Sequence, residues 1–353
     1  MAVADELRDS GAEVSFLGTR ERIEAELVPA AGYEIDFVKV RGIDRRNPLR
    51  AARAGLEALA AVGTARKALR RRGADVVMGG GGFVAGPAGL AAASTRTPLV
   101  LTEADSHLGL ANRLLAGRAR RVCLAFPIEG RGGDPYLVTG RPVPRAVLEG
   151  DRARARARFG IAPDAKALLV VGGSQGARSI NVAAVEAFAE RADAAIPGMR
   201  EEARSRDFDV VHIAGTRDFP ELEARLAAAP HPERYTLLAY EPNLGDALAA
   251  CDLVLGRSGG SIFEVVAVGR PAILVPYPFA TADHQSANAE WMRAGGAAKV
   301  IPDQELTGSR LAAEVAAVMG DEALLEEMAT ASLRMAKPDA ARRIADEVLG
   351  AAR

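Results

Sequence analysis

The feature that most constrains the fold is an apolar run that leads directly into a glycine-rich turn. The run is Ala167-Leu168-Leu169-Val170-Val171, and the turn is Gly172-Gly173-Ser174-Gln175-Gly176-Ala177. The run predicts a buried parallel strand, and apolar residues at helical spacing from Ile180 onward predict a helix. Such a junction can bind an anion, because glycines admit a ligand close to the backbone and the positive helix end faces it. The spacing matches neither the dinucleotide fingerprint nor the P-loop, and an ordinary tight turn is the alternative interpretation.

Strand and helix patterns alternate along both halves of the chain, and this predicts an α/β fold with two doubly wound, Rossmann-like domains. Two prolines beside Gly140-Arg141 end regular structure, so we predict domains of residues 1–143 and 144–337, with the C-terminal helix 338–353 joined to the first. The cleft between such domains is the expected binding site. The predicted strands are Val14–Gly18, Ile35–Val40, Asp75–Met78, Leu99–Thr102, Val122–Phe126, Tyr136–Thr139, Leu168–Val171, Val210–Ala214, Tyr235–Ala239, Leu253–Leu255, Ala272–Val275 and Ala298–Ile301.

The chain opens on a predicted helix, Met1–Asp9, rather than on a strand. The first helix of an alternating protein needs a sheet to cover. Either a strand and its loop belong upstream of this helix, or the first sheet lacks a central member.

The composition is that of a soluble globular protein and argues against several other classes. Of 353 residues, 49 % are hydrophobic and 26 % are charged, and the net charge of −1 gives no global attraction to nucleic acid. No apolar run approaches the roughly 18 residues of a membrane span, and no signal peptide is visible. Cys123 and Cys251 each lie in or beside an apolar run, so we expect buried thiols in a cytosolic protein.

No metal or nucleophile motif is present. Asp207-Phe208-Asp209 has the form of a carboxylate pair, but it precedes a strand, which is the wrong edge of the sheet for a ligand. His107, His212 and His231 have no spacing that suggests a metal site or a triad.

The stretch Arg41–Arg72 is strongly basic, with ten Lys and Arg against two acidic residues, an excess of eight positive charges. An apolar stripe flanked by arginines suits an anionic membrane surface, and a solvated helix packed on the sheet is the alternative. The stripe is predicted to comprise Leu49, Ala52, Leu56, Leu59, Val62 and Leu69.

Three further loops follow predicted strands. Gly79–Pro87 holds four consecutive glycines before the helical Ala88–Ser94, and is either a ligand loop or a hinge. Gly256–Glu264 places a carboxylate in the first turn of a helix, where it can accept hydrogen bonds from ribose hydroxyls or only stabilise the helix dipole. Pro276–Asn288 brings Asp, His, Gln and Asn together at a helix start, which suits sugar hydroxyls, although Asp283 can equally be a structural cap.

The order and spacing of these motifs over nearly the whole chain resembles the MurG family of bacterial N-acetylglucosaminyltransferases. Gly172–Ala177, Arg257–Glu264, Asp283–Asn288 and Gly81–Gly86 carry the resemblance. It implies a two-domain GT-B fold and an inverting β-1,4 transfer of N-acetylglucosamine from UDP-N-acetylglucosamine to lipid I, without an obligatory metal or other cofactor. It also implies a peripheral location at the cytoplasmic face of the cell membrane, against its anionic inner surface, and a part in peptidoglycan synthesis, cell shape and division.

The resemblance assigns residues to the substrates but gives no general base, so the catalytic residue stays unknown. Ser174 and its neighbouring amides would hold the diphosphate, Glu264 the ribose, and Gln285 the donor sugar. The Tyr240-Glu241 backbone would lie against the uracil, and Phe83 near the acceptor. The full donor set is Asp105, Arg145, Gly173, Ser174, Gln175, Gly176, Tyr240, Glu241, Gly259, Gly260, Ser261, Glu264 and Gln285, and the acceptor set is Gly81, Gly82 and Phe83.

The sequence departs from the family pattern at several places. The family's first strand and its glycine loop ending in histidine, which supplies the favoured base, would precede the helix at which this chain begins. The family's Glu-Gln-Asn signature is Glu103-Ala104-Asp105 here, and the expected arginine falls on Pro144, with Arg145 next. Two alternatives therefore stay open, an isomerase such as UDP-N-acetylglucosamine 2-epimerase and an inactive protein that binds a nucleotide sugar.

Overall fold

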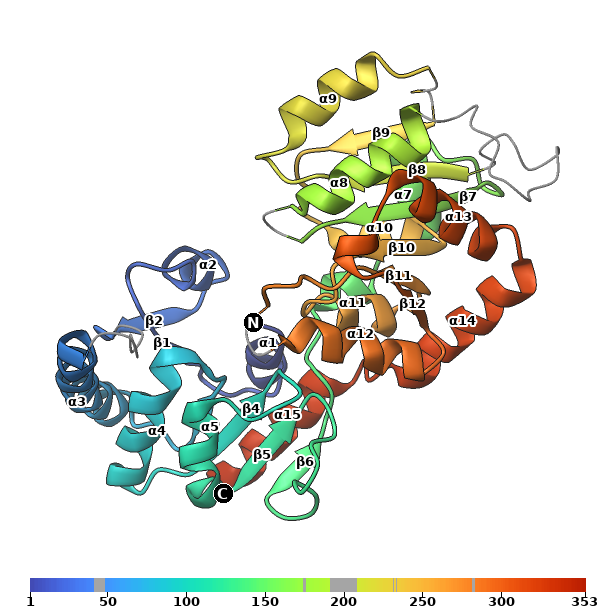
Figure 1. The fold of residues 1–353 in the computed structure, drawn as a ribbon. Helices are drawn as coiled ribbons and strands as arrows, with labels where there is room; N and C mark the ends of the chain where they lie inside the picture. The colour runs from blue at the N-terminus through green and yellow to red at the C-terminus, as the bar shows by residue number, and fades with distance from the viewer. Residues whose placement is uncertain (41–47, 174–175, 191–207, 231, 233, 281–282) are drawn as a thin grey trace. The chain divides into compact units, whose positions relative to one another are not determined.

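The computed structural model describes residues 1–40, 48–173, 176–190, 208–230, 232, 234–280 and 283–353, without the side chains of residues 48–56 and 58. The chain divides into two compact units, each with its own sheets and helices (Figure 1). The first unit comprises Met1–Pro142 together with Lys337–Arg353, and the second comprises Val143–Ala336.

The strands of the first unit fall into two separate parallel sheets. One sheet pairs β1 (Ser15–Gly18) with β2 (Glu34–Phe37). The other has the order β3-β4-β5-β6, formed by Val77–Gly79, Leu99–Glu103, Arg121–Leu124 and Tyr136–Val138. Among the described residues, no strand joins these two sheets.

The C-terminal helix packs with the N-terminal helix in the first unit. Val3 and Leu7 of α1 (Ala2–Asp9) share a buried cluster with Ile344 and Val348 of α15 (Ala340–Ala352). Cys123 of β5 lies in the same cluster, and burial raises the pKa of its thiol to about 12. The other helices of this unit are α2 (Glu24–Ala30), α3 (Pro48–Arg72), α4 (Gly82–Thr95), α5 (Leu110–Leu115) and the 3-10 turn η1 (Ala116–Arg118).

One sequence prediction for the first unit is wrong in detail. The glycine loop is shorter than predicted, because α4 already begins at Gly82 and contains Pro87. Of the predicted apolar stripe of α3, Leu59 is 69 % exposed, whereas Val62 and Leu69 pack against a buried cluster of small residues that includes Ala61 and Ala65. The other members of the stripe, Leu49, Ala52 and Leu56, lie outside the residues whose side chains are described.

The second unit is built on one parallel sheet of six strands, in the order β12-β11-β10-β7-β8-β9. Helices cover both faces of a parallel sheet, so its strands are continuous apolar runs, and Leu168, Leu253 and Ile273 are fully buried. The chain proceeds outward from β7 to β9 on one side and from β10 to β12 on the other. The strand order therefore reverses between β7 and β10. The strands are Lys166–Val171, Phe208–Ile213, Tyr235–Leu238, Leu253–Gly256, Ala272–Leu274 and Ala298–Val300 for β7 to β12.

Three helices of the second unit have an N-cap side chain. Asp151 caps α7 by accepting the Arg154 N–H, and Thr307 and Asp321 cap α13 and α14 in the same way. The elements are α6 (Arg145–Leu148), α7 (Arg152–Phe159), α8 (Arg178–Val185), the π-turn η2 (Glu186–Glu190), α9 (Phe219–Ala227), α10 (Leu244–Ala250), α11 (Ile262–Ala267), α12 (His284–Ala294), the 3-10 turn η5 (Asp303–Glu305), α13 (Gly308–Met319) and α14 (Glu322–Met335).

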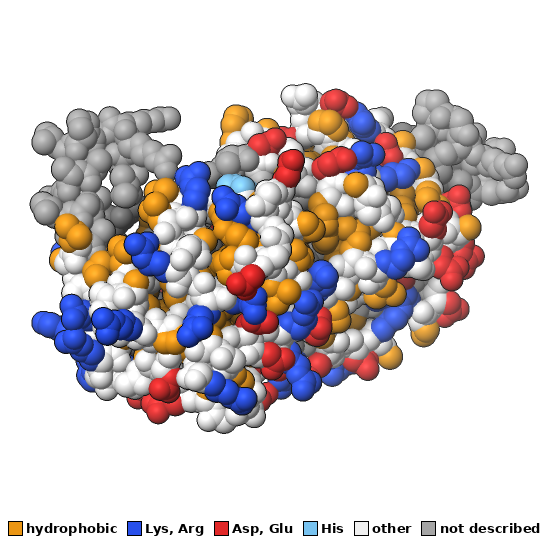
Figure 2. Space-filling view, turned by 90° about the horizontal axis from the view of Figure 1, so that it is seen from below, with side chains coloured by type: hydrophobic (Ala, Val, Ile, Leu, Met, Phe, Trp, Pro, Cys, Tyr) orange, Lys and Arg blue, Asp and Glu red, His pale blue; other side chains and the backbone are white. Residues whose placement is uncertain are grey.

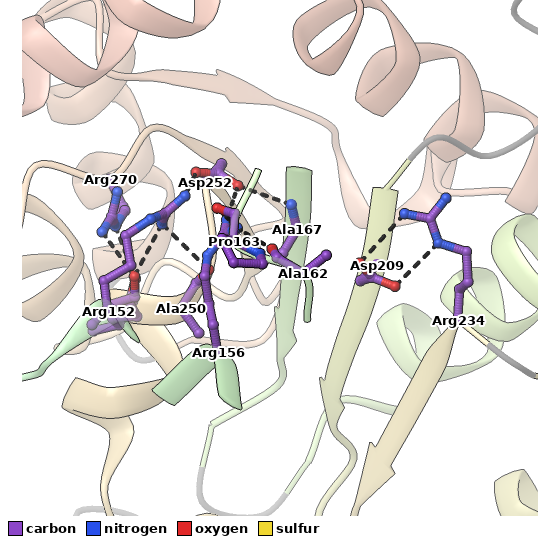
Figure 3. Close-up of polar contacts among 12 residues, drawn as sticks. Arg152, Arg156, Ala162, Pro163, Ala167, Asp209, Arg234, Ala250, Asp252 and Arg270 are labelled. Carbon is purple, nitrogen blue, oxygen red and sulfur yellow. Dashed lines mark hydrogen bonds and ion pairs between the residues drawn. The ribbon is translucent and has the colours of Figure 1, made fainter. Parts of the chain in front are cut away.

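Arginine at every second position of residues 151–159 predicts a capped, solvated helix, and most of α7 is exposed, but Arg152 and Arg156 bind Asp252 at the amino ends of the strands (Figure 3). Arg156 is only 3 % exposed and donates to the Ala250 carbonyl and to Asp252. Arg152 and Arg270 donate to the last carbonyls of α10. Alternation of Arg with Ala in the sequence does not reveal this burial, since the partners come from α10, far along the chain.

Candidate functional site

The loop between β7 and α8 requires glycine at specific positions. A Cβ on Gly172 would lie 2.3 Å from the Ala177 nitrogen, and one on Gly176 would lie 2.4 Å from the Ala214 oxygen. Gly173 and Gly176 also have φ of +88° and +75°, which only glycine adopts without strain. Ser174 and Gln175 lie outside the described residues. The loop leads into α8, whose N-cap residue is Ala177. No described side chain caps this helix, so its first-turn amides can bind an anion.

A polar network lies behind this loop, and the sequence did not predict it. Asn181 of α8 donates from Nδ2 to the Ala214 oxygen (2.8 Å) and to Asp218 (3.0 Å). Its Oδ1 lies 3.0 Å from Nε2 of His212, whose Nδ1 lies 2.7 Å from the Tyr235 hydroxyl. Burial lowers the pKa of His212 to about 3. The neutral ring donates to Asn181 and accepts from Tyr235, so His212 supports the loop and is not a ligand.

The second glycine loop, after β10, is joined to the start of α12. Ser258 is buried and donates from Oγ to the Gln285 carbonyl (2.7 Å), while Asn288 donates to the Ser258 carbonyl (2.9 Å). These bonds hold Gly259, Gly260 and Ser261 at the entrance to α11, with Glu264 in its first turn. Because β7 and β10 are neighbours, this loop and the loop before α8 flank the point of strand reversal, where doubly wound sheets bind ligands.

The Gln285 side chain is oriented by the backbone. Its Oε1 accepts the Tyr277 N–H at 3.0 Å, so its Nε2 is the group left to donate. That Nε2 would lie 3.9 Å from a Cβ on Gly259, so the amide faces the second glycine loop. An amide donor beside a glycine suits a sugar hydroxyl. Asp283, the alternative cap, instead accepts the Ser286 hydroxyl.

The remaining predicted donor residues of this unit lie in short connections. Tyr240 is exposed after β9, and the Glu241 carboxylate is already used, since it accepts the Asn243 N–H and pairs with Arg158, both at 2.8 Å. With that carboxylate engaged, a nucleobase could contact the backbone of this segment or the exposed Tyr240 side chain. Arg145 is exposed at the start of α6.

In the first unit, the predicted residues lie after the neighbouring strands β3 and β4. The buried Glu103 carboxylate accepts from the amides of Ala104, Asp105 and Gly109 and from Asn112 Nδ2, and so fixes the turn that holds Asp105. Glu103 is thus a structural residue of this turn.

The glycines after β3 shape the start of α4. Gly81 and Gly82 have φ of +80° and +74°. Phe83 is exposed in the first turn of α4, and the Arg22 guanidinium lies 5.1 Å from its ring centroid. An aromatic ring is thereby presented at this edge of the β3–β6 sheet.

Within the described part of the chain, no group of three or more His, Cys, Asp and Glu side chains is placed to hold a metal ion. Asp209, half of the carboxylate pair set aside in the sequence, is paired with Arg234 (Figure 3).

Comparison with known proteins gives matches over both units. The model of the glycosyltransferase family 28 N-terminal domain matches residues 1–124, and that of the family 28 C-terminal domain matches residues 167–344. A Moorella thermoacetica protein, named as the UDP-N-acetylglucosamine–N-acetylmuramyl-(pentapeptide) pyrophosphoryl-undecaprenol N-acetylglucosamine transferase, is 38 % identical over 99 % of this chain and 94 % of its own length.

Solved structures are also similar. The crystal structure of Acinetobacter baumannii MurG has a TM-score of 0.75 and 28 % identity, covering 99 % of this chain and 94 % of its own. UDP-GlcNAc 2-epimerase from Neisseria meningitidis has a TM-score of 0.62 and 13 % identity, covering 95 % and 99 %. At that identity, the epimerase shows a shared fold alone.

Proposed function

The chain belongs to glycosyltransferase family 28, and on that premise we propose that it transfers N-acetylglucosamine from UDP-N-acetylglucosamine to lipid I, which forms lipid II. The observation that carries the proposal is the match of relatives with this activity over nearly the whole chain, together with the two glycine loops at the strand reversal. Such a product would place the protein in peptidoglycan synthesis and cell wall biogenesis, and hence in cell shape and division.

The donor would bind along the loops of the second unit. The open amides of α8 would take the diphosphate, Glu264 the ribose hydroxyls, and the Gln285 Nε2 a hydroxyl of the sugar. The acceptor 4-hydroxyl oxygen bonds to the anomeric carbon from the face opposite the leaving group, and its proton passes to a general base. The bond between the anomeric carbon and the diphosphate oxygen breaks, and UDP leaves. Amides and the helix dipole stabilise the charge that develops on the leaving diphosphate.

We propose that this chemistry needs no metal, because helix amides face the charge that a cation would otherwise neutralise. Activity is then expected to persist at full rate in excess EDTA. Loss of turnover that returns with added Mg²⁺ or Mn²⁺ would contradict this.

Transfer is tested with purified protein, UDP-N-acetylglucosamine and a soluble lipid I analogue, with UDP release and product mass as readouts. We expect UDP only when the acceptor is present. Conversion of the donor to its 2-epimer without acceptor would favour the isomerase, and UDP-sugar binding in calorimetry without turnover would favour the inactive binding protein.

We further propose that the first unit contacts an anionic membrane surface peripherally. Leu59, Phe83, Leu90, Leu110 and Leu114 are exposed on α3, α4 and α5, which are packed against one another in that order. Toward the left of Figure 2, the side on which α3 and α4 lie in Figure 1, basic side chains lie among apolar ones. Among the described residues, no helix is long and apolar enough to cross a bilayer.

Not all the charge counted in the sequence is available to lipid. Arg71 and Arg72 are paired with Asp36 and Glu34 of β2, whereas Arg66, Lys67 and Arg70 have no ion-pair partner among the described residues. We expect co-sedimentation with vesicles containing anionic lipid and little with neutral ones, and loss of binding in L110S/L114S. Equal sedimentation with both vesicle types would contradict the proposal.

A further inference from the structure

Asp303 lies at the start of η5, just after β12, and belongs to no motif of the sequence. One oxygen of its carboxylate, Oδ1, accepts from Arg257 Nη1 at 2.6 Å and from the Ser179 hydroxyl at 2.7 Å. Arg257 Nη2 also donates to the Ser179 Oγ at 2.8 Å, which closes a triangle of three side chains. Ser179 is in the first turn of α8, so the triangle ties the candidate diphosphate helix to β10 and β12.

The Arg257 guanidinium reaches a third loop as well. Its Nη1 donates to the carbonyls of Val275 and Pro276, at 3.1 and 3.2 Å, and its carbon lies 5.4 Å from the Tyr277 ring centroid. Tyr277 in turn provides the N–H that orients Gln285. The side chain of Arg257 is only 13 % exposed. One guanidinium therefore connects the three loops to which the diphosphate, the ribose and the sugar are assigned.

We propose that Asp303 is a positioning residue of the donor site, acting through Arg257 and Ser179 to set the spacing of these three loops. The inference rests on the proposed function, since it presumes that the loops bind a UDP-sugar. Asp303 fixes the guanidinium in one position and neutralises it, so that Arg257 braces the loops and is not a ligand. Without the carboxylate, a mostly buried cation loses its only acidic partner among the described residues, and the loops it braces lose their common anchor.

The same sheet provides a matched control at its other edge. Asp209, the second residue of β8, pairs at 3.1 Å with Arg234, which directly precedes β9 (Figure 3). The side chains of Asp209 and Asp303 are 17 % and 22 % exposed, so both are partly buried carboxylates bound to an arginine. Loss of either carboxylate should lower stability, and D209A less than D303A, because the Arg234 side chain is 36 % exposed and that of Arg257 only 13 %. Only the loss of Asp303 should change the donor site.

The test compares D303A, D303N and D209A in the full chain, with calorimetric Kd for UDP, donor and acceptor KM, kcat and Tm. We expect D303A to raise the UDP Kd and the donor KM by about 10-fold, the loss of one charged hydrogen bond. D303N keeps an acceptor for Ser179 and should lie between D303A and wild type. The acceptor KM should not change, and D209A should leave UDP Kd within about 2-fold of wild type while its Tm also falls.

Equal UDP Kd values for D303A and D209A would overturn the inference, as would tighter binding by D303A, because Arg257 would then be a diphosphate ligand that Asp303 restrains. If D303A does not fold, S179A removes the bridging hydroxyl alone, and an unchanged UDP Kd for both D303N and S179A would overturn the inference equally. Failure of the wild-type protein to bind UDP or to transfer sugar would instead overturn the proposed function.

Discussion

The two edges of the six-stranded sheet use polar groups in opposite ways. At the amino ends of the strands, Asp252 accepts from Arg152 (2.6 Å), from Arg156 (3.0 Å) and from the Ala167 amide (2.9 Å) (Figure 3). Arg156 also donates to the carbonyls of Ala162 and Pro163. Among the described residues of this network, donors and acceptors pair with one another.

At the carboxyl ends, the described groups leave donors open. The first turn of α8 has no side-chain cap, and the amide of Gln285 accepts from backbone with one end and keeps the other for donation. Glycines such as Gly176 carry no side chain at this edge, so the backbone there packs closely. A buried polar group costs free energy unless it is hydrogen-bonded. Polar groups that bond to one another therefore stabilise the fold, whereas polar groups without a protein partner are able to bind a ligand.

The largest effect is expected from Asp252→Ala, which leaves two arginines without their carboxylate. Arg156 is buried, and removing one member of a buried ion pair costs about 3–5 kcal/mol. We expect that loss in the free energy of unfolding, measured by urea denaturation, with the UDP Kd of the folded fraction unchanged. A large change in UDP affinity would show that the two edges are not independent.

The opposite pattern is expected from Gly176→Ala. The new Cβ would lie 2.4 Å from the Ala214 oxygen at a φ of +75°, so the loop must move. The strain costs about 1–3 kcal/mol, and UDP affinity should fall by at least about 10-fold, measured by calorimetry. Gly160→Ala is the control, because it also has positive φ but has no atom near its Cβ and lies away from the loop. Equal UDP affinities for the two variants would contradict the assignment of the loop.

The pH dependence of the unfolding free energy should separate the contribution of His212, which supports the loop before α8, from that of the arginine network. Burial lowers the pKa of His212 to about 3 from an ordinary value near 6.5. Between these values the unfolded state binds more protons, so stability is fully present above pH 6.5 and is lost as the pH falls. The slope is at most about 1.4 kcal/mol per pH unit.

H212Q removes this titration. We therefore expect the difference in unfolding free energy between wild type and H212Q to change between pH 6.5 and 4, and to be constant above pH 7. A constant difference over the whole range would show that His212 is not held neutral.

Local sequence predicts the strands and loops of this fold well, and long-range polar partnerships poorly. The run before Gly172 predicts β7, because a strand that is buried on both faces consists of apolar residues. The glycine turns that follow such strands lie at their carboxyl ends, where doubly wound sheets bind ligands. The triangle of Ser179, Arg257 and Asp303 could not be predicted, because its members come from three separate loops and no spacing relates them. The burial of Arg156 was missed for the same reason, since two of its acceptors, Ala250 and Asp252, lie more than 90 residues further along the chain.

The smallest loss of stability is expected from a solvent-exposed polar group near the amino ends of the strands. Asp151 caps α7 by accepting the Arg154 N–H at 2.6 Å, and its side chain is exposed. Asp151→Ala should cost about 1 kcal/mol of unfolding free energy, well below Asp252→Ala, because water can replace the lost acceptor. Asp151→Asn, which still accepts the N–H, should recover most of it. If Asp151→Ala costs as much as Asp252→Ala, the stability of this edge comes from the helix start and not from the burial of its arginines.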